Sequence, residues 1–174
     1  MKLLWFVTGY FVISLILYIV CRAKCKKNAV FRMPKSKWVF YILSFTWGLP
    51  TVVIGAIIAL FVRLAGHKPK RYGWEWCFEI PDLGWGLELG LFFIAPTGHE
   101  SVHMHEHGHG IQNIYLGIFD PLVVSVPSVV RFWYREIREK LGKPCKTKYD
   151  DAWFEASASE SGKVFIKRLR DEQK

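Results

Sequence analysis

Two long stretches near the N-terminus carry no charged side chain. Residues 3–21 are almost entirely apolar, and residues 38–62 are uncharged although they include Gly48, Pro50 and Gly55. A helix of about 20 apolar residues crosses a hydrocarbon core about 30 Å thick, and glycine and proline are tolerated within such helices. The pattern therefore predicts two N-terminal transmembrane helices, the second of them kinked.

The segment between these stretches is basic and contains no acidic residue. Its cations are Arg22, Lys24, Lys26, Lys27, Arg32, Lys35 and Lys37. A cleaved signal peptide is disfavoured, because these charges stand where a small-residue cleavage site would follow the apolar stretch. The positive-inside rule places this loop in the cytoplasm and both termini outside, although the cations after residue 62 weaken the rule here. We predict a transmembrane hairpin with a basic loop over residues 1–64.

A period of two residues follows the second apolar stretch. Large apolar side chains alternate with glycine, glutamate and cysteine over residues 72–80, and the alternation resumes over residues 85–93. Pro81, Asp82 and Gly84 supply turn residues between the two runs. Alternating runs joined by a turn are typical of a β-hairpin.

The remaining segments show helical patterns. Residues 99–117 contain no proline, follow a break at 96–98 and predict a helix that carries most of the histidines. Residues 114–130 are apolar but interrupted by Asp120, Pro121 and Pro127, which favours a buried or re-entrant helix pair over a third crossing. A short helix over 150–161 ends at Gly162, and 163–174 form a charged tail. The prediction is an α+β membrane protein with a second domain over residues 65–162.

The net charge of +9 in 174 residues indicates that the chain binds a negatively charged partner. A basic chain can bind nucleic acid, but much of this charge flanks the apolar stretches, where anionic lipid head groups neutralise it. The bilayer is therefore the favoured partner, and nucleic acid is not expected. The cysteines at 21, 25, 77 and 145 have neither metal-site spacing nor the density of a disulfide scaffold.

The predicted histidine-rich helix contains a metal-binding pattern. His105 and His109 stand four residues apart, so their imidazoles lie on one helix face and can bind one zinc ion. Glu106 is rotated by about 100° from His105, which suits a general base. A second copy of the pattern, from His99 to His103, lies close to the helix start and is disfavoured for that reason.

A catalytic zinc usually has three protein ligands and one open position. Glu155 is the candidate for the third ligand, because it lies in a helical segment whose small residues allow close packing, with Asp151 in reserve. From the spacing alone, a non-enzymatic helix that binds metal through its histidines remains an equal alternative.

Several motifs, in this order, resemble an uncharacterised family of small bacterial membrane proteins. They are RYGW (71–74), GWGLELG (84–90), HEHGHGIQN (105–113), PSVVRFWYRE (127–136) and YDDAWFE (149–155). That family is similar to the zincin metallopeptidases whose third ligand is a glutamate on a later helix. The resemblance implies that His105, His109 and Glu155 hold zinc, that Glu106 is the base, and that one hairpin strand lines a peptide-binding cleft.

The resemblance also bears on the roles of residues around the predicted zinc ligands. Glutamate zincins carry an aspartate where this chain has Ser159, so the support of the ligand histidines must differ. Gln112 and Asn113 either orient the site or serve helix packing. Arg131, Tyr134 and Arg135 either stabilise an oxyanion or form the basic end of a helix beside the membrane, and the second role is favoured.

The leading hypothesis is a membrane-anchored zinc peptidase, multi-pass in a bacterial plasma membrane, that acts on a peptide or protein. The alternatives are a non-enzymatic metal-binding membrane protein and a basic membrane-surface adaptor whose zinc site has decayed.

Overall fold

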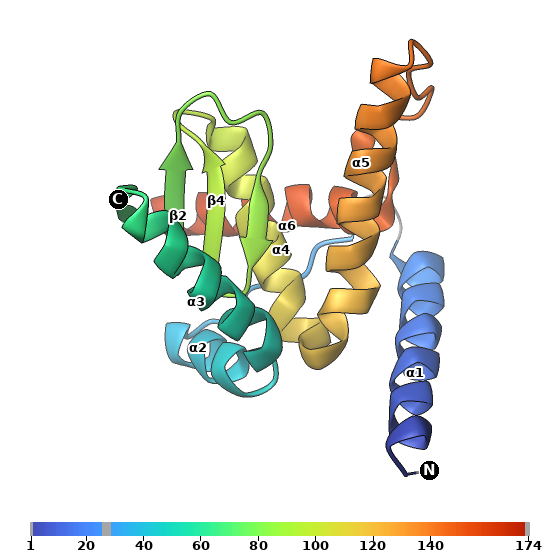
Figure 1. Ribbon diagram of the computed structural model, residues 1–174. Coiled ribbons are helices and arrows are strands. Elements are labelled where there is room, and N and C mark those ends of the chain that lie inside the picture. Colours follow the sequence, from blue (N-terminus) through green and yellow to red (C-terminus); the bar gives the residue numbers. More distant parts are fainter. Residues whose placement is uncertain (1, 26–28, 173–174) are drawn as a thin grey trace.

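The computed structural model describes residues 2–25 and 29–172 (Figure 1). Lys26 and Lys27 of the basic loop and the last two residues of the predicted tail lie outside this part. The first helix, α1 (Lys2–Lys24), stands at one side of the molecule and is long and apolar enough to cross a membrane. The first predicted membrane helix is thus present.

The prediction of a second, kinked transmembrane helix over residues 38–62 is wrong, because the stretch is not one helix. This stretch forms two helices, α2 (Lys37–Thr46) and α3 (Leu49–Leu64), which meet at an angle of 92°. Gly48 precedes α3 and Pro50 occupies its first turn, a position where proline starts a helix but cannot continue a preceding one. In the described part of the chain, α1 is the helix that could cross a membrane by itself.

The predicted β-hairpin is also wrong. The first alternating run is divided between β1 (Pro69–Tyr72) and β2 (Glu75–Ile80), and the second between β3 (Leu87–Leu89) and β4 (Phe92–Pro96). Gly73 and Gly90 have positive φ and lie in the tight turns that reverse the chain inside each run. The sheet order is β1-β2-β4-β3, and its central strands, β2 and β4, are parallel. β3 is therefore an edge strand.

The predicted histidine-rich helix is confirmed as α4 (Glu100–Leu116). The chain then turns through η1 (Gly117–Phe119) and the π-helical η2 (Pro121–Ser125) into α5 (Val126–Lys140), and the two arms differ in direction by 117°. This agrees with the expected break at Asp120-Pro121. Val123 and Val124 are buried at the turn, whereas α5 has no buried residue and exposes Val130 and Trp133.

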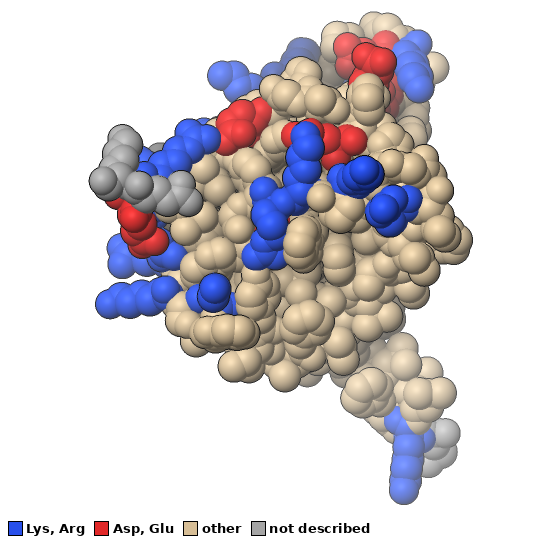
Figure 2. Space-filling view, turned by 90° about the vertical axis from the view of Figure 1, so that its left-hand side faces the viewer, with Lys and Arg blue, Asp and Glu red and all other residues tan. Residues whose placement is uncertain are grey.

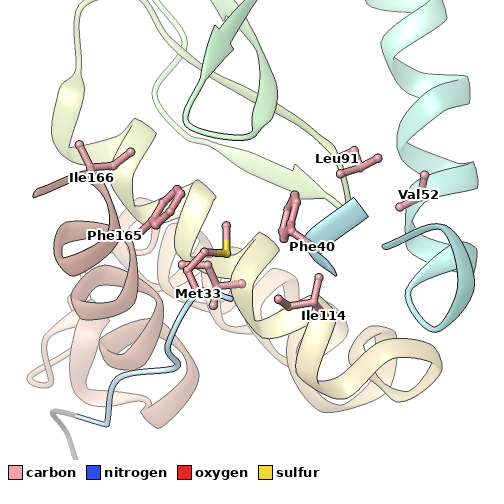
Figure 3. Packing of buried hydrophobic residues seen from close by; sticks show 8 residues of the cluster. Met33, Phe40, Val52, Leu91, Ile114, Phe165 and Ile166 are labelled. Atoms are coloured by element: carbon pink, nitrogen blue, oxygen red, sulfur yellow. The ribbon is translucent and has the colours of Figure 1, made fainter. Parts of the chain in front are cut away.

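The last helix, α6 (Trp153–Asp171), follows the short η3 (Tyr149–Asp151) and lies across α4 (Figure 1). It does not end at Gly162, so the prediction of a charged tail from residue 163 is wrong. Phe165 and Ile166 are buried, and they share a cluster with Phe40 and Val52 of the bent helices (Figure 3). Full burial of such a side chain stabilises the fold by about 1.5–3 kcal/mol.

Candidate metal centre

The close crossing of α4 and α6 positions the site. A Cβ atom on Gly108 would lie 1.9 Å from the Ala158 carbonyl oxygen, and one on Gly162 would lie 1.7 Å from the Met104 carbonyl oxygen. Both obstacles are backbone atoms, so only glycine permits this separation of the helices. The expectation that small residues let the later helix pack closely is confirmed, and Glu155 in the first turn of α6 reaches the middle of α4.

His105, His109 and Glu155 lie close enough together to hold a metal ion. The His105 Nε2 and His109 Nε2 atoms are 3.2 Å apart. Oε2 of Glu155 lies 3.1 Å from His105 Nε2 and 3.4 Å from His109 Nε2, and makes no hydrogen bond within the described chain. Three ligand atoms thus converge from two helices.

Both histidines are held through their other ring nitrogen. His109 Nδ1 lies 2.8 Å from Gln112 Oε1, and the Gln112 amide nitrogen donates to the carbonyl oxygen of Phe154 at 2.7 Å. His105 Nδ1 lies 2.8 Å from Ser159 Oγ. These contacts leave each Nε2 atom directed at Glu155. Ser159 thus contacts the ring nitrogen of His105 that faces away from Glu155.

The glutamate is anchored in the same way. Glu155 Oε1 accepts a hydrogen bond from Ser128 Oγ at 2.7 Å, which fixes the carboxylate against α5. Burial would raise the pKa of Glu155, but the adjacent imidazoles of His105 and His109 hold it well below its usual value. Burial would lower the pKa of His109, but the Glu155 carboxylate raises it to about 10. The cluster strongly favours a positive charge beside Glu155.

Glu106 faces the cleft from the neighbouring side of α4. Its side chain is buried, and a Cβ atom on Gly86 would lie 2.3 Å from Glu106 Oε1. The loop before β3 therefore needs glycine at this position to leave room for the carboxylate. Burial raises the pKa of Glu106, against the opposing effect of His105 and His109.

The site opens into a cleft of about 650 Å³. His105, Glu106 and His109 border it, together with the loop before β3 and the inner face of α5. Most of its other walls are apolar, formed by Trp85, Leu87, Val124, Val129, Phe132 and Trp133. A ligand here would meet His105, Glu106 and His109 of α4 on one side and apolar side chains on the other.

Ser128 and Tyr149 are polar residues at this site that the sequence analysis did not single out. The ring of Tyr149 lies 6.3 Å from that of His105, and its hydroxyl lies 3.5 Å from Ser128 Oγ. Burial, reinforced by the Glu155 charge, raises the pKa of Tyr149, so the phenol stays protonated. Both residues fall within two of the motifs quoted above, but only the fold brings them beside the histidines.

The sequence analysis also singled out two arginines, Tyr134 and Asn113, which do not belong to the group of His105, His109 and Glu155. Arg131 donates to the carbonyl oxygens of Lys148 and Tyr149, and Arg135 to that of Thr147, so these arginines hold the segment that carries Tyr149. Tyr134 is exposed. Asn113 is buried beside Gly48, which fits the packing role.

The upstream copy of the histidine pattern does not form an equivalent group. His99 precedes α4 and is exposed, and Glu100 accepts hydrogen bonds from Tyr72 and Arg170. His103 is buried against the rings of Tyr72 and Phe93.

The reserve ligand Asp151 accepts a hydrogen bond from the Lys148 backbone at 2.9 Å. Among the described residues, the metal-compatible group is formed by His105, His109 and Glu155.

A second buried histidine contact lies on the opposite face of α4. His107 Nδ1 is 2.9 Å from Glu75 Oε2, and both side chains are fully buried. Burial lowers the pKa of His107 to about 3 and raises that of Glu75 well above its usual value, so both groups are held neutral. Gly110 provides the space for Glu75 at this face.

No family model, curated protein or solved structure matches the chain. The geometry of the cleft is therefore the basis for assigning a function.

Proposed function

We propose that this protein is a membrane-anchored zinc peptidase. The observation that carries the proposal is the convergence of His105, His109 and Glu155 on one point, with both Nδ1 atoms already engaged. Two imidazoles and one carboxylate, with an open fourth position, are a donor set that catalytic zinc prefers.

The separations of the donor atoms support a single small ion. Ligand atoms about 2.0–2.2 Å from a tetrahedral zinc lie about 3.3–3.6 Å from one another. The three pairs here are 3.1, 3.2 and 3.4 Å apart. The unpartnered Oε2 atom of Glu155 also fits an ion at this point, because a buried carboxylate oxygen without a partner is costly.

The reaction we propose is hydrolysis of a peptide bond. A bound zinc ion would polarise the carbonyl group and lower the pKa of a water molecule. Glu106 accepts the proton of the attacking water and passes it to the leaving amine, as its raised pKa allows. The Tyr149 hydroxyl, held protonated beside His105, donates a hydrogen bond to the charge that develops on the carbonyl oxygen.

The cleft favours an extended peptide with an apolar side chain. β3 is an edge strand and borders the cleft, so its free side can pair with a peptide main chain. Phe132 and Trp133 form the wall across the cleft and would receive a large apolar side chain.

The alternative function, a non-enzymatic helix that binds metal ions through its histidines, is supported less well. Such a helix would bind several ions through accessible histidines, but His103 and His107 are buried against other groups. In the part of the chain that the structure describes, the metal-compatible group is therefore the one formed by His105 and His109 of α4 with Glu155 of α6.

The test combines metal content with cleavage of a peptide library rich in apolar residues. The wild-type protein should contain one zinc per chain, and Glu106→Gln should keep the zinc while cleavage falls by about 10²–10⁴-fold, the usual contribution of a general base. Glu172→Gln is a matched control, because Glu172 lies at the C-terminal end of α6 and pairs with Arg168, and neither residue borders the cleft. Wild-type protein without stoichiometric zinc would refute the proposal.

A further inference from the structure

The bends of the two broken helix pairs meet at one level of the molecule. Trp47, at the bend between α2 and α3, donates a hydrogen bond to the Tyr115 carbonyl oxygen, and its ring lies 5.9 Å from that of Phe119. On the other side, Phe119 stacks on Tyr10 of α1 at 5.5 Å, and the Tyr10 hydroxyl donates to the Ile118 carbonyl oxygen. The two bends and Tyr10 therefore lie at similar depth along α1.

This depth lies inside the length of α1. At 1.5 Å per residue, Tyr10 is about 12 Å from Lys2 and about 18 Å from Arg22 along the helix axis. Residues 2–8 are all exposed, and Figure 1 shows this end of α1 projecting beyond the other elements. A bilayer core about 30 Å thick around α1 would thus contain the bends, and the bends would not reach its far side.

The chain leads back toward the Arg22 side from both bends. α3, α4 and α5 run in that direction, whereas α2 lies across the lower end of the molecule and is reached from that side by the segment before it (Figure 1). Tyr41 in the middle of α2 accepts a hydrogen bond from Arg71, and the end of α3 packs against Phe78 and Ile80 of β2. α4 begins at Glu100, beside Arg170, and α5 ends with basic residues in its last turn. The bends are therefore the tips of two hairpins.

The surface chemistry separates along the same direction. Figure 2 shows charged side chains over the upper and middle parts of one face, whereas the lowest part of the body is uncharged and the projecting helix carries charge only near its tip. Exposed apolar residues on α2 and α3 include Trp38, Ile42, Phe45, Ile54, Ile57 and Phe61. Within residues 1–21, Lys2 is the only cation, and every other lysine and arginine follows.

We propose that the chain crosses the bilayer once, through α1, and that both bends enter from the Arg22 side and return to it. The occupant of the exposed apolar surface is the lipid of that leaflet, continuous with the lipid around α1. The basic residues around Arg22 and Arg71 meet its anionic head groups, which makes this side cytoplasmic by the positive-inside rule. The domain after α1 thus faces the cytoplasm, opposite to the expectation that both termini lie outside.

This arrangement also places the candidate metal centre. Trp153, two positions before Glu155, contacts the ring of Tyr18 at 6.2 Å, and Tyr18 is about 6 Å from Arg22 along α1. The cleft therefore lies near the head groups of the cytoplasmic leaflet. Resting on the proposed peptidase function, this position suits a substrate segment that leaves the membrane on the cytoplasmic side.

The test is cysteine labelling with a membrane-impermeant maleimide in spheroplasts of a bacterial host, before and after lysis. Cys21→Ala, Cys25→Ala and Cys145→Ser give the background, since Cys77 is buried. Single cysteines then replace five exposed residues: Lys2, Lys35, Lys68, Thr97 and Lys143. We expect Lys2→Cys to react in intact spheroplasts, and the other four to react only after lysis.

Each pair of sites probes one hairpin. Lys35→Cys and Lys68→Cys flank the α2–α3 bend, and Thr97→Cys and Lys143→Cys flank the α4–α5 turn. If the two sites of either pair react from opposite sides, that pair crosses the membrane and the proposal is overturned. The same conclusion follows if Lys2→Cys reacts only after lysis, or if the four others react before it. Zinc content plays no part in the readout, so failure here is distinct from failure of the peptidase proposal.

Discussion

The two faces of α4 both bury histidines against glutamates, yet only one of them borders the cleft. On the face toward β2, His107 contacts Glu75, and neither group borders the cleft. On the face toward α6, His105 and His109 share one oxygen of Glu155 and both border the cleft. The same residue types therefore give a closed pair in one place and an open three-residue group in the other.

The difference lies in what surrounds the rings. Gln112 and Ser159 engage the Nδ1 atoms of His109 and His105, so each ring is fixed in orientation and presents Nε2. At His107, Nδ1 faces Glu75, and the ring packs on Phe165 at 4.9 Å, which leaves no room for a ligand from elsewhere. A histidine–glutamate contact becomes a candidate metal site only when neighbouring residues hold the rings from behind.

The largest expected effect comes from exchanging each glutamate for glutamine. Glu155→Gln keeps the size of the side chain but removes the charged ligand, so zinc affinity should fall by more than the roughly 10–100-fold typical of an outer partner. Glu75→Gln should keep stoichiometric zinc, because Glu75 contacts His107 on the other face. Zinc titration against a competing chelator measures both. Equal loss of zinc in the two variants would contradict the distinction between the two faces of α4.

A smaller effect is expected where a neighbouring residue fixes the ring of His105 or His109. Gln112→Leu removes the acceptor for His109 Nδ1 and should weaken zinc binding by about 10–100-fold. Asn113→Leu is the neighbouring control, since Asn113 packs beside Gly48 and does not contact the ligands. The same competition assay applies. An unchanged zinc affinity in Gln112→Leu would show that the His109 ring needs no support from Gln112.

The sequence predicted the parts of the site that depend on short-range pattern. The spacing of His105 and His109 placed both on one face of a proline-free helix, and the small residues after Glu155 indicated close packing. The structure brings these residues together. Ser128 and Tyr149 could not be found in this way, because their contacts join α5 and η3 to the site across the fold.

The errors in the fold have a common physical cause. The alternating runs were real, but the tight turns at Gly73 and Gly90 reverse them, and at Gly90 the space is set by Val52 on a distant helix. Likewise, Gly162 indicated a helix end but serves as the contact with Met104. Glycine can end an element or allow two elements to touch, and only the tertiary packing distinguishes these roles.

The smallest effect concerns pH and separates the partners of the closed pair. The pKa of His107 is lowered to about 3 in the folded state, against 6.5 for an unperturbed histidine. Between these values the unfolded chain binds a proton that the folded chain does not, so the contribution of His107 to stability falls as the pH falls. The stability advantage of wild type over His107→Asn should therefore shrink below about pH 6.5, by up to about 1.4 kcal/mol per pH unit.

Glu75 should give the opposite slope. Its pKa is raised well above 4.5 by burial, so above pH 4.5 the folded chain keeps a proton that the unfolded chain releases. The stability advantage of wild type over Glu75→Gln should shrink as the pH rises above about 4.5. Denaturant unfolding in detergent from pH 4 to 8 measures both differences. If both slopes were reversed, with the His107 contribution lost as the pH rises and the Glu75 contribution lost as it falls, the pair would be an ion pair, and the contrast with the open face of α4 would then rest on access to the cleft alone.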